Sequence, residues 1–194
     1  MMNGCPRWSF LTVPLLAALG CSDPVPRPAQ GNLTLSIQPP DGPGTCPVPG
    51  HTYVVGNPLG PNNAKPGDRL IDGEAGANIK CSVHGSATFT FSGTIKGTTS
   101  VGAPDKVTFT ISSGVINADK LTGTASIAVN TTGLAGNYTS AANGCTIAVV
   151  PGQVKAGSLW ATATCPSITD PTSPGKACKV GDTTTFVLEN CDGS

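Results

Sequence analysis

The residue types that acid–base catalysis requires are scarce in this chain. It has two histidines, His51 and His84, among many serines. A Ser-His-Asp site needs a histidine beside its nucleophile, and the sequence has no Gly-x-Ser-x-Gly motif to present such a serine. We therefore expect both histidines to lie in surface turns and assign no catalytic residue. The alternative is a secreted hydrolase that uses His51 or His84 together with an acidic loop.

That acidic loop is the segment GDRLIDGEAG, which contains Asp68, Asp72 and Glu74. Two carboxylates at a fixed separation can cleave glycosides, and oxygen-rich loops can hold calcium. The spacing does not match an EF-hand loop, and Asp72-Gly73 favours a solvated turn. The three acids are thus a weak calcium candidate, and we expect no other metal site and no cofactor.

Trp160 is the aromatic residue most suited to a ligand. Its neighbours Leu159 and Ala161 are predicted to face inward, so alternation along a strand points Trp160 outward. An outward ring on a β-sandwich is what sugar-binding modules stack on pyranose rings, and Tyr53 is a second candidate for such a platform. A bulge at Gly157 would reverse the phase and bury the indole instead. A carbohydrate-binding module that uses Trp160 is therefore a second alternative.

The candidate site residues lie within or between short segments in which apolar and polar residues alternate. Alternation of apolar and polar residues with period two predicts strands that have one wet face. The segments lie in NLTLSI, NIKCSV, ATFTFSGTI, KVTFTI, LTGTASIAVN, CTIAVV, SLWATATC and TTTFVLEN. About eight strands with Gly, Asn, Asp or Pro turns predict an antiparallel β-sandwich or an open barrel. We expect its core to contain Phe89, Phe91, Phe109, Ile127 and Phe186. Residues 39–76 are expected to be largely irregular, although His51–Val55 hints at a strand.

The N-terminus reads as an export signal. Arg7 precedes an apolar run from Trp8 to Leu19, which is too short to span a bilayer and fits a signal peptide over residues 1–20. The run ends in Ala18-Leu19-Gly20-Cys21. This sequence resembles the lipobox of bacterial lipoproteins, which implies cleavage before Cys21 and lipidation of that residue. Ser22 after the cysteine implies, by analogy, sorting to the outer membrane. A Pro-rich tether over 21–31 would then lead to a single domain, 32–194.

Six cysteines remain after Cys5 leaves with the signal and Cys21 takes lipid. They are Cys46, Cys81, Cys145, Cys165, Cys178 and Cys191. An even number in an exported chain predicts three disulfides, of unknown pairing. We expect the bridge of Cys46 to attach the irregular segment to the sheet. The surrounding tail, GSLWATATCP to FVLENC, resembles a pattern in cysteine-rich β lipoproteins of unknown function and implies no activity.

Composition limits the partners. Only 11% of residues are charged and the formal net charge is zero, so the clustered cations of a nucleic-acid interface are missing. We expect a non-catalytic cell-envelope lipoprotein that binds or structures a surface. It would contact the membrane through its lipid anchor and take a polysaccharide or an envelope protein as partner.

Overall fold

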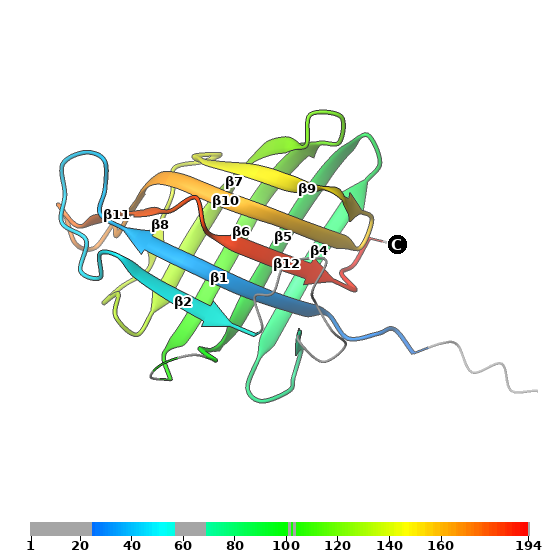
Figure 1. The fold of residues 1–194 in the computed structure, drawn as a ribbon, viewed down its shortest axis with the longest axis horizontal. Coiled ribbons are helices and arrows are strands. Elements are labelled where there is room, and N and C mark those ends of the chain that lie inside the picture. Colours follow the sequence, from blue (N-terminus) through cyan, green and yellow to red (C-terminus); the bar gives the residue numbers. More distant parts are fainter. Residues whose placement is uncertain (1–24, 57–68, 101, 103, 194) are drawn as a thin grey trace, which may run out of the picture.

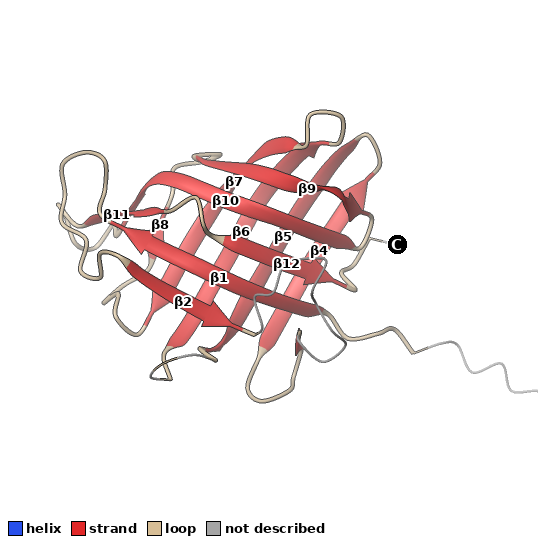
Figure 2. Cartoon of the chain, in the orientation of Figure 1, coloured by secondary structure: helices blue, strands red, loops and turns tan. Residues whose placement is uncertain are grey.

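The computed structural model describes residues 25–56, 69–100, 102 and 104–193, and their regular structure is entirely β (Figure 2). Twelve strands occur in these residues. They are β1 (Gln30–Gln38), β2 (His51–Val55), β3 (Leu70–Ile71), β4 (Asn78–Gly85), β5 (Thr88–Thr98), β6 (Lys106–Asn117), β7 (Thr122–Thr131), β8 (Tyr138–Thr139), β9 (Cys145–Lys155), β10 (Ser158–Thr169), β11 (Ala177–Val180) and β12 (Thr185–Glu189). The predicted all-β class is confirmed, but the predicted number of about eight strands is wrong.

The difference lies in four short strands. Each of the eight alternating segments overlaps one of the other eight strands, whereas β2, at which the sequence only hinted, and β3, β8 and β11 have 5, 2, 2 and 4 residues. Runs of two to four residues, such as β3, β8 and β11, carry too few alternations to be recognised from period two. Two of them, β2 and β3, interrupt the segment 39–76 that was expected to be largely irregular.

All twelve strands belong to one sheet, and every strand pair in it is antiparallel. The main path runs β11-β1-β12-β10-β8-β7-β6-β5-β4. In Figure 1 the sheet forms two layers: β2, β1, β12, β10 and β9 lie in front, and β7, β6, β5 and β4 cross steeply behind them. The apolar faces of the two layers enclose the core between them.

β9 joins the two layers along one side. Its Ile147 pairs with Ala163 of β10 and, on the opposite edge, with Gly123 of β7. At another corner the segment after β12 returns to β4, where Val83 N–H donates to the Asp192 carbonyl (2.9 Å) and Asp192 N–H donates to the Cys81 carbonyl (3.0 Å). The sheet is therefore connected on both sides of the core.

The core consists of the inward residues of both layers. The five side chains predicted for it, Phe89, Phe91, Phe109, Ile127 and Phe186, are all at most 5% exposed. The rings of Phe109 on β6 and Phe186 on β12 lie 5.7 Å apart between centroids, so the back and front layers meet through them. The prediction of these core residues is confirmed.

Three disulfides hold this sheet, as the sequence predicted. Cys46–Cys178 joins the segment between β1 and β2 to β11, Cys81–Cys191 joins β4 to the segment after β12, and Cys145–Cys165 joins β9 to β10. The bridge of Cys46 thus attaches its irregular segment to the sheet. Three disulfides indicate an oxidising, extracytoplasmic environment.

Candidate functional site

Trp160 lies on the outer face of the front layer. It pairs with Val187 of β12, which in turn pairs with Asn32 of β1, and these three side chains point away from the core. All three are nevertheless covered, at 6%, 6% and 3% exposure. The phase predicted for Trp160 therefore holds, yet its ring is not free to solvent.

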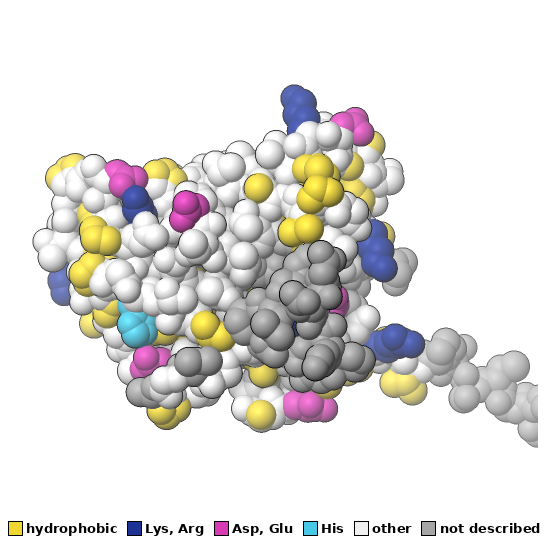
Figure 3. Space-filling model, in the orientation of Figure 1, with side chains coloured by type: hydrophobic (Ala, Val, Ile, Leu, Met, Phe, Trp, Pro, Cys, Tyr) yellow, Lys and Arg dark blue, Asp and Glu magenta, His cyan; other side chains and the backbone are white. Residues whose placement is uncertain are grey.

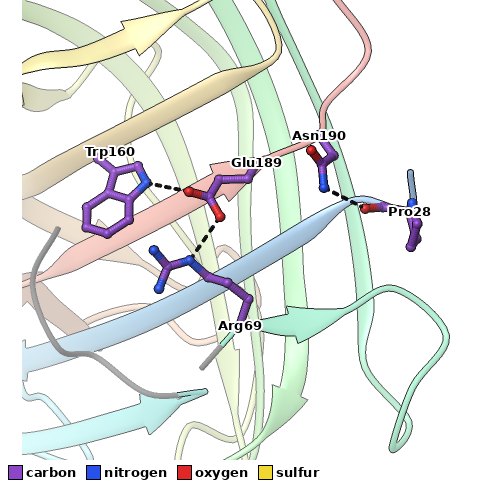
Figure 4. Close-up of polar contacts among 5 residues, drawn as sticks. All are labelled: Pro28, Arg69, Trp160, Glu189 and Asn190. Carbon is purple, nitrogen blue, oxygen red and sulfur yellow. Dashed lines mark hydrogen bonds and ion pairs between the residues drawn. The ribbon is translucent and has the colours of Figure 1, made fainter. Parts of the chain in front are cut away.

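The indole of Trp160 belongs to a charged cluster with Arg69 and Glu189 (Figure 4). Trp160 Nε1 donates to Glu189 Oε1 (3.1 Å), and Arg69 Nε donates to Glu189 Oε2 (3.0 Å). The Arg69 guanidinium carbon lies 4.4 Å from the centre of the indole ring. This cation–π contact occupies one face of the ring, and because Trp160 as a whole is only 6% exposed, it offers no free face on which a sugar could stack.

A polar pocket of about 500 Å³ adjoins this cluster. Its lining includes Arg27, Gln30, Lys155, Ser158, Glu189 and Asn190. Three segments meet here: the chain entering β1, the turn between β9 and β10, and the end of β12. Figure 1 shows the N-terminal segment and the C-terminal end leaving the domain on this same side.

The turn between β9 and β10 is fixed on both sides. Gly157 N–H donates to the Val83 carbonyl (2.9 Å), and the Gly157 carbonyl accepts from Cys191 N–H (2.9 Å). Gly157 has a φ of +77°, a conformation that glycine adopts without strain. The turn thereby places Lys155 and Ser158 at the pocket at fixed positions.

The second aromatic candidate, Tyr53, lies on the other face of the sheet. It is 1% exposed and its hydroxyl oxygen accepts from Thr131 Oγ1 (3.1 Å). Burial raises the pKa of this hydroxyl above its usual value. Tyr53 and Trp160 thus do not form one aromatic platform.

The structure also separates the histidines from the acidic turn. Asp72 accepts a hydrogen bond from Ile79 N–H (2.8 Å) near the start of β4. His84 lies five residues after Ile79 on the same strand, which places the two residues about 17 Å apart. His51 pairs with Ile37 near one end of β1. Gln30, at the other end, pairs with Ile71 beside the acidic turn, and the seven residues from Gln30 to Ile37 span about 23 Å. Both histidines are exposed, as expected, but the expectation that they lie in turns is wrong: His51 begins β2 and His84 lies in β4.

Two predicted site residues, Cys21 and Asp68, lie outside the described residues. Glu74 is exposed, and no group of three metal-ligating side chains occurs in the described part of the chain. No helix of that part is long and apolar enough to cross a bilayer.

The residues that build the pocket were missed by sequence reasoning. Arg27 lies more than a hundred residues before Lys155 and Glu189 in the sequence, and no short motif links the three. Only the outward phase of Trp160 pointed to this region. The partner Glu189 follows from the pairing of β10 with β12, which a single sequence does not reveal.

Comparison with protein-family models, with curated proteins and with solved structures finds no match to this chain.

Proposed function

We propose that this chain is a lipid-anchored envelope protein whose β domain acts by binding or structuring a surface and not by catalysis. The observation that carries the proposal is the arrangement of the N-terminal segment. Residues 25–28 are exposed and lead away from the sheet before β1 begins (Figure 1). A segment placed in this way suits a tether between Cys21 and the domain.

The surface supports a binding or structural role. On the face drawn in Figure 3, charged side chains are few and most of the visible described surface is neutral. The described residues bring together neither a nucleophile with a histidine nor a histidine with the acidic turn. We also propose that the fold is best described as an open barrel, because β9 joins its layers and Asp192 reaches β4 at another corner.

The anchor is tested on the protein produced from the full chain in a Gram-negative host. We expect the mature protein to start at Cys21, to carry acyl chains by intact mass, and to sediment with membranes. Cys21→Ser should abolish acylation, and Cys5→Ser is the matched control that should leave it unchanged. A mature protein without acyl chains would overturn the proposed anchor.

The outer-membrane address is tested separately. Separation of inner and outer membranes on a density gradient should place the acylated protein in the outer-membrane fraction. Recovery in the inner membrane would leave the anchor standing and overturn only the sorting.

A further inference from the structure

The open pocket beside the tether is bordered by backbone segments that hydrogen bonds hold in place. Asn190 Nδ2 donates to the Pro28 carbonyl (3.2 Å), which holds the entering chain against the end of β12. Gly157 holds the opposite wall through its two backbone hydrogen bonds. The disulfide Cys81–Cys191 fixes the segment next to both walls. A pocket built in this way keeps its shape before a ligand arrives, which lowers the cost of binding.

The charges that face this pocket are predominantly positive. Arg27 and Lys155 are exposed lining residues, and neither takes part in an ion pair among the described residues. Glu189 also lines the pocket, but its carboxylate is turned toward Trp160 and Arg69, and Arg69 balances its charge (Figure 4). Asp192 lines the adjoining pocket of about 550 Å³, which also includes Arg27. Among the described lining residues of the first pocket, Arg27 and Lys155 are thus without an ion-pair partner, and the carboxylate present, that of Glu189, is balanced by Arg69.

We propose that this pocket binds a phosphate ester. The guanidinium of Arg27 can donate two parallel hydrogen bonds to phosphate oxygens, and the ammonium of Lys155 supplies a second positive charge. The side chains of Gln30 and Ser158 add neutral donors. The volume exceeds that of a bare anion, so the group esterified to the phosphate also fits inside.

The position of the pocket suggests where such an ester comes from, and this step rests on the proposed anchor. Arg27 is six residues from Cys21, a distance of at most about 20 Å in an extended chain. If Cys21 carries lipid, the pocket lies within that distance of the bilayer surface. Phospholipid headgroups and soluble phosphate esters share the chemistry that the pocket recognises.

Binding is measured by calorimetry on the mature protein from the full chain, in dodecyl maltoside micelles that contain no phosphate. The probes are glycerol phosphate and inorganic phosphate, with sodium chloride at equal ionic strength as the control. We expect saturable heat with glycerol phosphate and none with chloride. Absence of binding to a folded, oxidised sample would overturn the proposal.

Two variants locate the site. Arg27→Gln and Lys155→Gln should each weaken the affinity for glycerol phosphate about five- to tenfold, because each removes a charge-assisted hydrogen bond. Lys120→Gln changes an exposed lysine in the turn between β6 and β7 and should leave the affinity unchanged. Unfolding midpoints verify that all three variants fold. Equal affinities in all three would overturn the assignment of the pocket.

A third comparison distinguishes the source of the ester and keeps the proposal separate from the anchor. In phospholipid nanodiscs a headgroup would already occupy the pocket, so the heat with glycerol phosphate should disappear. Heat that persists in nanodiscs supports the site and assigns it to a soluble ester. Binding by a protein whose intact mass shows no acyl chains supports the site while the proposed anchor fails.

Discussion

At the scale of single residues, the charge of Arg69 depends on one partner, Glu189. Its side chain is 9% exposed, its Nε donates to Glu189, and its Nη1 is buried without a hydrogen-bond partner. Glu189 is itself only 29% exposed. Removing one member of a covered ion pair leaves the other uncompensated, and this costs more than the pair contributes.

Glu189→Gln is therefore expected to destabilise the domain. The glutamine carbonyl can still accept from Trp160, but Arg69 loses its countercharge, and we expect a loss of about 1–3 kcal/mol given the partial exposure of Glu189. Urea denaturation followed by tryptophan fluorescence measures the change. Glu74→Gln, at an exposed position, is the control and should stay within about 0.5 kcal/mol. Equal stability of both variants would show that Arg69 does not depend on Glu189.

Asp170, in the turn after β10, is a carboxylate that accepts two hydrogen bonds from its own turn. Its Oδ1 accepts from Thr172 N–H (2.9 Å) and from Thr172 Oγ1 (2.8 Å). The hydrogen bond from the Thr172 backbone is the main cause that lowers the pKa of Asp170 below its usual value of 3.8. The folded state thus binds a proton at Asp170 less readily than the unfolded chain does.

This lowered pKa predicts how stability depends on pH. The contribution of Asp170 is fully present above pH 3.8 and disappears as the pH falls through the lower pKa of the folded state. In urea denaturation, Asp170→Asn should be less stable than wild type at pH 6, and the gap should narrow at pH 3. Asp182→Asn, at an exposed turn position, is the control that should show no such narrowing. A gap that is constant with pH would contradict the assigned cause.

Sequence reasoning predicted correctly which way a side chain points from its strand, because alternation determines this. It did not predict which side chains of other strands lie next to it, because this depends on strand order and register. Phe109 and Phe186 follow the inward phase of their strands and are buried as expected. The outward phase of Trp160 was also correct, because it depends only on Leu159 and Ala161. Its burial involves contacts with Arg69, which directly precedes β3, and Glu189 of β12, and a single sequence does not indicate which segments are neighbours.

At the scale of elements, β6 shows how a strand can change phase. Val107, Phe109 and Ile111 point inward, and so do Gly114 and Ile116, although the latter two have the opposite parity. Between the pairs Phe91–Gly114 and Gly93–Ile111, β6 contains one more residue than β5. The extra residue forms a bulge at Ser112–Ser113, two consecutive exposed residues. This bulge keeps the apolar residues of both halves of the strand in the core.

Beyond the bulge, Gly114 leaves room for the ring of Phe91. A Cβ atom at position 114 would lie 2.2 Å from Phe91 Cζ, closer than atoms can approach. Phe91 is 3% exposed and cannot move aside without disturbing its neighbours in the core. The absence of a side chain at Gly114 is thus required by the ring on the adjacent strand.

Gly114→Ala should consequently lower the free energy of unfolding by about 1–3 kcal/mol through overpacking. Chemical denaturation monitored by circular dichroism measures the loss. Gly42→Ala is the matched control, because a Cβ there meets nothing within 4 Å, and it should stay within about 0.5 kcal/mol. A neutral Gly114→Ala would mean that Phe91 can reorient, and the close packing described for this pair would be wrong.

The long strands were thus predictable and the exact connections were not. Period two identified segments such as those of β5 and β10, because eleven or twelve residues contain several alternations. The four short strands depend on longer partners that supply their hydrogen bonds. Leu70–Ile71 is a strand only because Gln30 and Gly31 lie opposite.

At the scale of the whole molecule, the corner between β4 and the C-terminal segment links the last strand of the main path to the segment after β12. Cys81–Cys191 lies at this corner, together with the backbone hydrogen bonds of Val83, Asp192 and Gly157. The bridge spans 110 residues of sequence, so it restricts most of the unfolded chain. The same corner borders the proposed phosphate pocket.

Removing this bridge with Cys81→Ala and Cys191→Ala should cost about 2–4 kcal/mol of stability, which denaturant unfolding measures. This corner should also open before the whole domain unfolds, because the contacts that remain there are a few hydrogen bonds at the end of the chain. Hydrogen exchange should therefore accelerate at the amides of Val83, Gly157 and Asp192 well below the unfolding midpoint. The amides that pair β9 with β7 are held by a complete ladder and serve as the internal control. If the corner amides stay as protected as that ladder in the double variant, the backbone hydrogen bonds alone hold this corner together, and the disulfide acts only on the unfolded chain.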